Sequence, residues 1–162
     1  MNEKLGLRIW EKLRHAKHKQ NISPVLNQIE IEEILKTCQV QFLGARRERP
    51  KEAYEVWRIA PIGSAVIELV RLKRSTAYER HRHNYSKSTL QIACGEGHLV
   101  EGEGDFEPYV SGAVFEVPPR GPHGFFTIDE TYFISLNDPA IAAHDGHVDI
   151  EFLDKRNLDY NP

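Results

Sequence analysis

Cysteine is rare in this sequence of 162 residues, and it lacks long apolar runs and a strong net charge. The two cysteines, Cys38 and Cys94, lie far apart and form no close-spaced ligand pair, so we expect no disulfide framework and a reducing, cytoplasmic location. No apolar run approaches the roughly 20 residues that span a bilayer, and residues 1–10 lack the apolar core of a signal peptide. A net charge of −3 gives no reason to expect nucleic acid or an anionic membrane as a partner.

The N-terminal part of the chain has the pattern of two amphipathic helices. Apolar residues recur at helical spacing over residues 3–19, opposed by lysines and arginines. Ser23-Pro24 has the pattern of an N-cap followed by proline in the first turn, which predicts a second helix from about Pro24 to Thr37. We expect the apolar faces to pack against the rest of the protein or a second subunit, and not against a membrane. The residues expected to be buried are Leu5, Ile9, Leu13, Ile29 and Leu35.

From Val40 onward the pattern becomes that of β-strands. Short stretches rich in branched and aromatic residues are separated by turn-forming residues, such as those at 95–97 and 118–122. Many short strands at near-regular spacing favour an antiparallel sandwich or barrel, in a chain whose length suits one domain. The predicted strands are Tyr54–Ile59, Ala65–Leu72, Thr89–Ala93, Gly97–Glu101, Ala113–Val117, Tyr132–Leu136 and Val148–Phe152.

Three histidines have the spacing of a metal site. His81 and His83 are one residue apart, and on a strand they project from the same face because side-chain direction repeats every two residues. His123 follows a turn braced by proline and glycine, from which a third imidazole can complete a facial set of nitrogen ligands. Such a set leaves other coordination positions of the metal open.

These residues resemble the two motifs of the cupin superfamily. The first motif would comprise His81-x-His83, Ser88 and Gly95, and the second Gly112, Pro118 and His123. The resemblance covers about the central third of the chain, roughly residues 77–137. It implies a mainly β protein: a double-stranded β-helix, which is the small RmlC-like jelly-roll barrel of cupins, with a short N-terminal α-helical extension. On this basis we expect the extension at residues 1–38 and the barrel at residues 39–162.

The chain departs from the cupin pattern at one ligand position. Where most cupins have a metal-binding glutamate, this sequence has Ser88, whose hydroxyl is a weak neutral donor. The predicted ligands are therefore His81, His83 and His123, and the metal site keeps more positive charge than one with a carboxylate. Such a site favours an anionic or chelating substrate and the presentation of O₂ beside it. The resemblance then points to three-histidine dioxygenases that act on thiols or diketones, with Fe²⁺ the expected metal and Zn²⁺, Ni²⁺ or Mn²⁺ as alternatives.

Three further residues are candidates for catalytic roles. Arg58 could recognise a substrate carboxylate, or it could be an exposed surface arginine. Glu79 shares the face of His81 and could act as a base or substitute ligand, or it could form a salt bridge at the barrel mouth. Tyr85 could supply a phenol for proton transfer, although tyrosines in a barrel more often have a packing role.

The fold itself leaves more than one function open. The first is oxidation of a small chelating substrate by O₂ at a mononuclear non-haem Fe²⁺ centre. The second is an isomerase, cyclase or lyase in which Zn²⁺ or Ni²⁺ acts as a Lewis acid without O₂. The third is a non-catalytic cupin that binds or senses a metabolite. Because many small cupins pair through their barrel edges, the resemblance also implies a homodimer.

Overall fold

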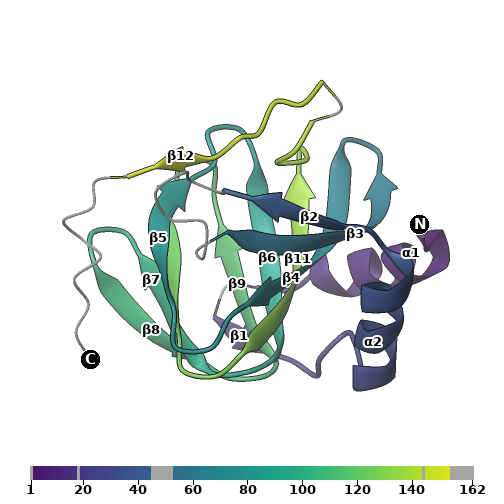
Figure 1. Ribbon diagram of the computed structural model, residues 1–162, viewed down its shortest axis with the longest axis horizontal. Helices are drawn as coiled ribbons and strands as arrows, with labels where there is room; N and C mark the ends of the chain where they lie inside the picture. The colour runs from purple at the N-terminus through teal and green to yellow at the C-terminus, as the bar shows by residue number, and fades with distance from the viewer. Residues whose placement is uncertain (1, 18, 45–52, 144, 154–162) are drawn as a thin grey trace.

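Two antiparallel β-sheets lie face to face in the computed structural model, which describes residues 2–17, 19–44, 53–143 and 145–153 (Figure 1). One sheet has seven strands, in the order β1 (Gln20–Asn21), β9 (Ala113–Val117), β6 (Lys87–Cys94), β11 (Thr131–Asp138), β4 (Ala65–Leu72), β3 (Tyr54–Ile62) and β2 (Val40–Leu43). The other has five, in the order β12 (Glu151–Phe152), β5 (Ala77–Arg82), β10 (His123–Thr127), β7 (Gly97–Glu101) and β8 (Asp105–Tyr109).

The path of the chain explains how distant residues meet. From β4 to β12 successive strands alternate between the two sheets, except at the β7–β8 hairpin, where both strands stay in the five-stranded sheet. As a result β5 pairs with β10, and β6 with β11, although other strands separate them in sequence. This alternation is the topology of the double-stranded β-helix expected from the sequence.

Most predicted strands are confirmed. β4, β7 and β9 match their predicted ranges residue for residue, and β3, β6 and β11 run a few residues longer than expected. The predicted strand at 148–152 is shortened to β12, while Val148 forms only an isolated bridge with Ala142. β5, β8 and β10 are absent from the predicted strands, because glycine, proline and charged residues weaken their strand pattern, and so are the short strands β1 and β2.

Two helices precede β2, and each differs from the prediction at one end only, α1 at its end and α2 at its start. α1 (Glu3–Leu13) ends well before residue 19, and Asn2 caps its start by accepting the Leu5 N–H. α2 (Gln28–Thr37) begins four residues after Pro24, because Asn27 and Glu30 form a capping box there. Among the described residues, no helix is long and apolar enough to cross a membrane.

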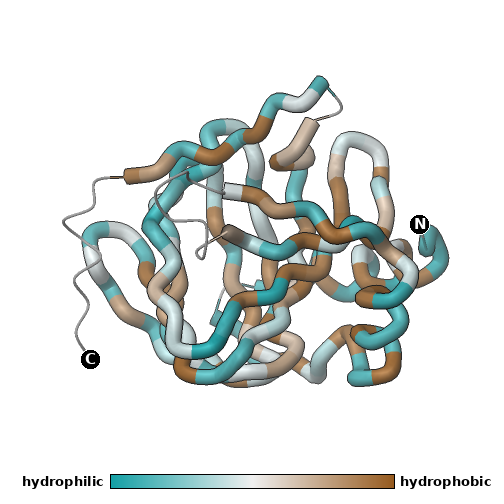
Figure 2. The backbone as a smooth tube through the Cα atoms, viewed as in Figure 1, coloured by the Kyte–Doolittle hydropathy of each residue, from teal (hydrophilic) through white to brown (hydrophobic). Residues whose placement is uncertain are grey.

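Both helices pack on the outer face of the seven-stranded sheet. Ile9 and Leu13 of α1, with Ile31 and Ile34 of α2, share one buried cluster with residues of β3, β4 and β11. A side chain at Gly6 would place its Cβ 2.5 Å from the Ala60 Cβ, so this close approach of α1 to β3 requires glycine. In Figure 2 hydrophobic stretches recur along the barrel strands, while the helices mix hydrophobic and hydrophilic residues.

The burial predicted for the helices is confirmed only in part. Ile9 and Leu13 are fully buried, and Leu5 and Leu35 are partly buried against the same cluster. The prediction for Ile29 was wrong, because its side chain is 75% exposed. Ile29 is two residues from Ile31, which is about 200° around an α-helix, so it faces solvent when Ile31 and Ile34 face the sheet.

Replacing Leu13 with alanine should test this packing. Leu13 is fully buried, so the substitution removes apolar contacts and leaves a cavity, at an expected cost of about 2–5 kcal/mol in the free energy of unfolding. Leu7→Ala on the same helix is the matched control, since Leu7 is 53% exposed, and it should change stability by less than about 0.5 kcal/mol. Equal denaturation midpoints for the two variants would show that α1 contributes little to the core.

Candidate metal centre

The three histidines predicted as ligands meet in the space between the two sheets. His81 lies in β5, His83 follows the end of that strand, and His123 is the first residue of β10. All three are buried, and each offers a ligand atom within 4.8 Å of those of the other two. Their ring centroids are 4.3–5.0 Å apart. The predicted grouping is therefore present in the structure.

The local geometry of β10 accounts for the position of His123. His123 is the register partner of His81, and the pairing of β10 with β5 becomes irregular just after it. A side chain at Gly124 would place its Cβ 2.9 Å from the Tyr78 carbonyl oxygen, so only glycine allows β10 to lie this close to β5. Such an irregularity re-aims a side chain, and here it follows the residue that faces the other two imidazoles.

Each imidazole is oriented by a main-chain carbonyl. The Nδ1 atoms of His81, His83 and His123 lie 3.1, 2.6 and 3.0 Å from carbonyl oxygens, which belong to Glu79, Asp149 and Gly121 respectively. Because a carbonyl oxygen only accepts, each Nδ1 carries the proton and donates it. The Nε2 lone pair of each ring is then left for a metal, as in most histidine-ligated sites.

Burial keeps the three rings neutral. Desolvation, together with repulsion from the neighbouring imidazoles, lowers the pKa of His81 well below its ordinary value and lowers the pKa of His123 to about 3. Desolvation also lowers the pKa of His83, although the contacts with Asp149 oppose it. Neutral imidazoles with free Nε2 atoms around one point fit a divalent transition-metal ion.

Ser88, which the sequence has in place of a carboxylate ligand, lies in the wall of the site. It lies on β6, lines the same cavity as the histidines, and donates its hydroxyl to Asn137 Oδ1 at 2.7 Å. In the described part of the chain, no Asp or Glu belongs to the group of mutually close ligand atoms. The ligands that the structure brings together are thus three neutral histidines.

The cavity beside the histidines is small and mostly apolar. It measures about 50 Å³ and lies between the inner faces of the two sheets. Phe125 and Phe133 stack at 5.2 Å between ring centroids and form part of its wall. Its other apolar lining residues are Leu43, Tyr54, Val56, Val70, Leu90, Ile141 and Ile150.

A polar cluster on the seven-stranded sheet was not predicted from the sequence. Glu68 of β4 and Asn137 of β11 both line the cavity, and Asn137 Nδ2 donates to Glu68 Oε2 at 3.2 Å. The hydroxyls of Ser88 and Ser135 both donate to Asn137 Oδ1. One signal was available in the sequence: Glu68 is the only acidic residue in the otherwise apolar stretch Ala65–Val70.

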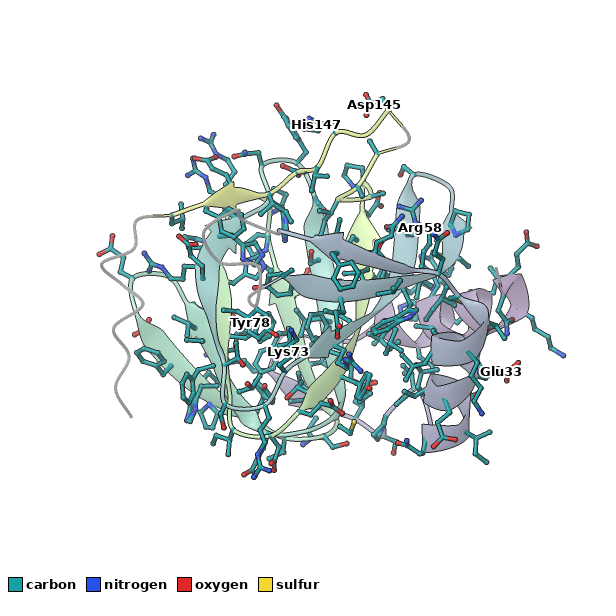
Figure 3. All side chains as sticks on the ribbon, viewed as in Figure 1. Glu33, Arg58, Lys73, Tyr78, Asp145 and His147 are labelled. Carbon is teal, nitrogen blue, oxygen red and sulfur yellow. The ribbon has the colours of Figure 1, made fainter. Side chains whose placement is uncertain are left out.

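None of the three residues predicted to be catalytic is among those that line the cavity, and each has a different environment. Arg58 is neither in the cavity wall nor freely exposed: its Nη2 donates to the Ala142 carbonyl at 3.0 Å, and its Nε lies 3.8 Å from Glu68 Oε1 (Figure 3). Glu79 is buried on β5 but does not line the cavity, so a catalytic role for it stays a prediction.

Tyr85 does not line the cavity. Its side chain is 71% exposed, because the chain turns after β5 and the strand alternation that would have aimed it inward ends there. The turn is held by Asp149, whose carboxylate accepts the backbone N–H groups of Asn84, Tyr85 and Ser86 at 2.8–3.1 Å. The expectation that the Tyr85 phenol serves the site is therefore corrected.

Asp149 links this turn to a predicted metal ligand. Its carbonyl accepts from His83 Nδ1, and its carboxylate holds the turn that follows His83. Burial raises the pKa of Asp149, but the three N–H donors and the nearby His83 outweigh it and hold the pKa below its usual value, so the carboxylate is ionised. Asp149 therefore positions His83 through both its backbone and its side chain.

Replacing Asp149 with alanine should weaken metal binding without removing a ligand. The change leaves three backbone N–H groups without their acceptor and frees His83 to move, so we expect the dissociation constant for metal to rise about 10- to 100-fold. Asp145→Ala is the matched control, because Asp145 lies exposed on the same segment (Figure 3) and accepts a hydrogen bond from the His147 N–H. Titration with a competing chelator measures both, and equal affinities would contradict the positioning role.

Comparison with solved structures identifies the fold. No family model matches the sequence, and no curated protein matches it. An RmlC-like cupin from Shewanella frigidimarina is similar over 65% of this chain and 86% of its own, at 15% identity and a TM-score of 0.52. A predicted oxalate decarboxylase from Thermotoga maritima is similar over 65% and 96%, at 15% identity and a TM-score of 0.54. A putative sugar phosphate isomerase from Acidithiobacillus ferrooxidans is similar over 72% and 75%, at 15% identity and a TM-score of 0.56.

These likenesses establish the architecture. At such low identity they show that the chain has the double-stranded β-helix fold of cupins, and they carry no reaction with them. The activity has to be argued from the three histidines and the cavity.

Proposed function

We propose that this double-stranded β-helix protein is a metal-dependent enzyme of the non-haem Fe²⁺ dioxygenase type, acting on a small chelating or anionic substrate. The observation that supports it most is the group of three neutral imidazoles whose Nε2 atoms are free to bind one metal ion. When bound there, Fe²⁺ would supply redox chemistry toward O₂ and open coordination positions. Zn²⁺, Ni²⁺ and Mn²⁺ remain alternative metals for the same ligands.

The residues of the chain would favour an anion at this centre. Three neutral ligands leave the full charge of a divalent ion uncompensated, and a negatively charged chelator compensates it. The apolar walls formed by Phe125, Phe133 and Leu90 lower the local dielectric constant, which strengthens that attraction. The small volume of the cavity selects a substrate of few atoms.

A second function is favoured by one specific observation. Glu68 places a buried carboxyl on the cavity wall, and a carboxyl that can hold or release a proton suits an isomerase, cyclase or lyase. In that case Zn²⁺ or Ni²⁺ would act as a Lewis acid without O₂. Binding of a metabolite without turnover is the non-catalytic alternative.

Anaerobic purification with metal analysis should test the centre and separate these functions. We expect about one divalent ion per chain, lost in His123→Ala and retained in the control His147→Ala, whose histidine is exposed. O₂ uptake with small thiols, β-diketones or hydroxylated aromatic acids would support the dioxygenase. Full metal occupancy in His123→Ala would refute the centre, and turnover without O₂ uptake would favour the second function.

Introducing a carboxylate at position 88 should test whether the site depends on its neutral ligands. In Ser88→Glu we expect metal to bind at least as tightly, because a negative charge is added beside it. Turnover should fall about tenfold or more, a change of about 1.4 kcal/mol in the barrier, since the carboxylate takes a position that substrate or O₂ needs. Ser88→Ala separates the two effects, because it removes the hydroxyl and its hydrogen bond to Asn137 without adding charge. Unchanged kcat in Ser88→Glu would place the open position elsewhere.

We also propose that the protein is a homodimer with a small molecule as its ligand. Phe42 supports the dimer, because it is 59% exposed on β2, the edge strand of the seven-stranded sheet. An apolar side chain on an exposed edge is a surface that a second copy can cover. The mass in solution tests this assembly, and a mass of one chain would contradict it.

A further inference from the structure

A buried carboxyl faces the cavity from the wall opposite the histidines. Glu68 is 1% exposed and lies in the middle of β4, in the seven-stranded sheet, whereas the histidines belong to β5 and β10 and their flanks in the five-stranded sheet. Both groups line the same cavity. A ligand bound to a metal on the histidines would therefore have Glu68 on its far side.

The two oxygens of Glu68 have different surroundings. Oε2 accepts the Asn137 amide at 3.2 Å. Oε1 has no hydrogen-bond partner among the described residues, and its contact with Arg58 Nε, at 3.8 Å, is too long for a hydrogen bond. A buried polar atom without a hydrogen bond costs free energy, and because Glu68 lines the cavity, a ligand bound there can supply the hydrogen bond that Oε1 lacks.

The neighbours of Glu68 hold its carboxyl in place. Asn137 is itself fixed by the hydroxyls of Ser88 and Ser135, which both donate to its Oδ1. Arg58 is fixed from the other side by the Ala142 carbonyl. The carboxyl is thus oriented before any ligand arrives, which lowers the entropy that a ligand must lose on binding.

We propose that Glu68 is a ligand-contacting residue that selects small anionic chelators: its Oε1 donates a hydrogen bond to the ligand oxygen that points away from the metal. This inference rests on the proposed function, since it takes the metal on the histidines as the other attachment point. The ligand class is then a small molecule with two oxygens for the metal and at least one further oxygen directed at the seven-stranded sheet.

The direction of the pKa shift of Glu68 agrees with a carboxyl that donates a hydrogen bond. Burial raises the pKa of Glu68, and this outweighs the lowering effects of the Arg58 charge and the Asn137 hydrogen bond. A protonated carboxyl donates one hydrogen bond and does not repel an anion, whereas an ionised one could only accept. Removing Glu68 should consequently weaken the binding of an anionic chelator, and not strengthen it.

Binding of two anions to the Co²⁺-loaded protein should test the proposal. Oxalate chelates a metal and leaves oxygens pointing outward, whereas azide reports only on the open metal position. In Glu68→Met, which keeps the side-chain volume, we expect oxalate to bind roughly 10- to 100-fold more weakly and azide unchanged. Glu68→Gln should bind oxalate within about threefold of the wild type, because its amide still donates. Glu55→Gln is the matched control, since Glu55 lies on β3, pairs with Arg71 and does not line the cavity.

Two results of the binding experiment would overturn the proposal while leaving the metal centre intact. Oxalate binding that is unchanged in Glu68→Met would show that the carboxyl does not touch the ligand, and tighter binding would show that it repels the anion.

Infrared spectroscopy provides a second test, which needs neither metal nor the Met variant. A carbonyl band of a protonated carboxyl should be present in the wild type and in Glu55→Gln at neutral pH and absent in Glu68→Gln, and a wild type without that band would refute the donor. Failure of the wild type to bind Co²⁺ would instead refute the proposed function.

Discussion

The antiparallel pairing of β10 with β5 is the constraint on which the candidate metal centre depends. It places His123 opposite His81 in register, and the spacing of two residues brings His83 to the same side as His81. A slip of one residue would turn an imidazole to the opposite face of its sheet. The three imidazoles therefore come together only when β10 and β5 pair in this register. Gly124 makes that pairing possible, because it allows the two strands to approach closely.

The groups that accept hydrogen bonds from the histidine Nδ1 atoms influence the net charge of the site. Histidine ligands are often held by carboxylates, which increase their basicity and bring negative charge to the metal. Here the acceptors of all three Nδ1–H groups are main-chain carbonyls, which are neutral. The rings are oriented equally well, but the positive charge of a bound ion remains available to the ligand. Ser88 in place of a carboxylate has the same effect, so two independent features support the anionic ligand that we propose.

The parts of the site that follow from short-range periodicity could be predicted, and those that depend on tertiary contacts could not. The spacing of His81 and His83, and the turn before His123, are local features, and they identified the three grouped histidines. The placement of Tyr85 failed because Asp149, some sixty residues later in the sequence, holds the turn that points it outward. The start of α2 also differs from the prediction, because the Asn27–Glu30 capping box, and not Ser23-Pro24, begins the helix.

Glu68 escaped prediction for a different physical reason. β4 is buried on both faces, because α1 and α2 cover its outer side and the cavity lies on its inner side. Such a strand shows no alternation of polar and apolar residues, so the sequence does not reveal which side chains face the cavity. The exception is a single acidic residue in an apolar run, which is costly to bury and is for that reason a signal of function.

One segment of the chain connects the two walls of the cavity. Between β11 and β12, the Ala142 carbonyl accepts from Arg58, which lies beside Glu68, and Asp149 holds both the His83 ring and the turn after it. Figure 1 shows this segment crossing one end of the barrel from the seven-stranded sheet to the five-stranded sheet. A displacement of the segment would therefore alter the orientation of a metal ligand and that of the opposing carboxyl together. In the proposed function, the geometry across the cavity, and not either wall alone, would set the length of a ligand that spans from the metal to Glu68.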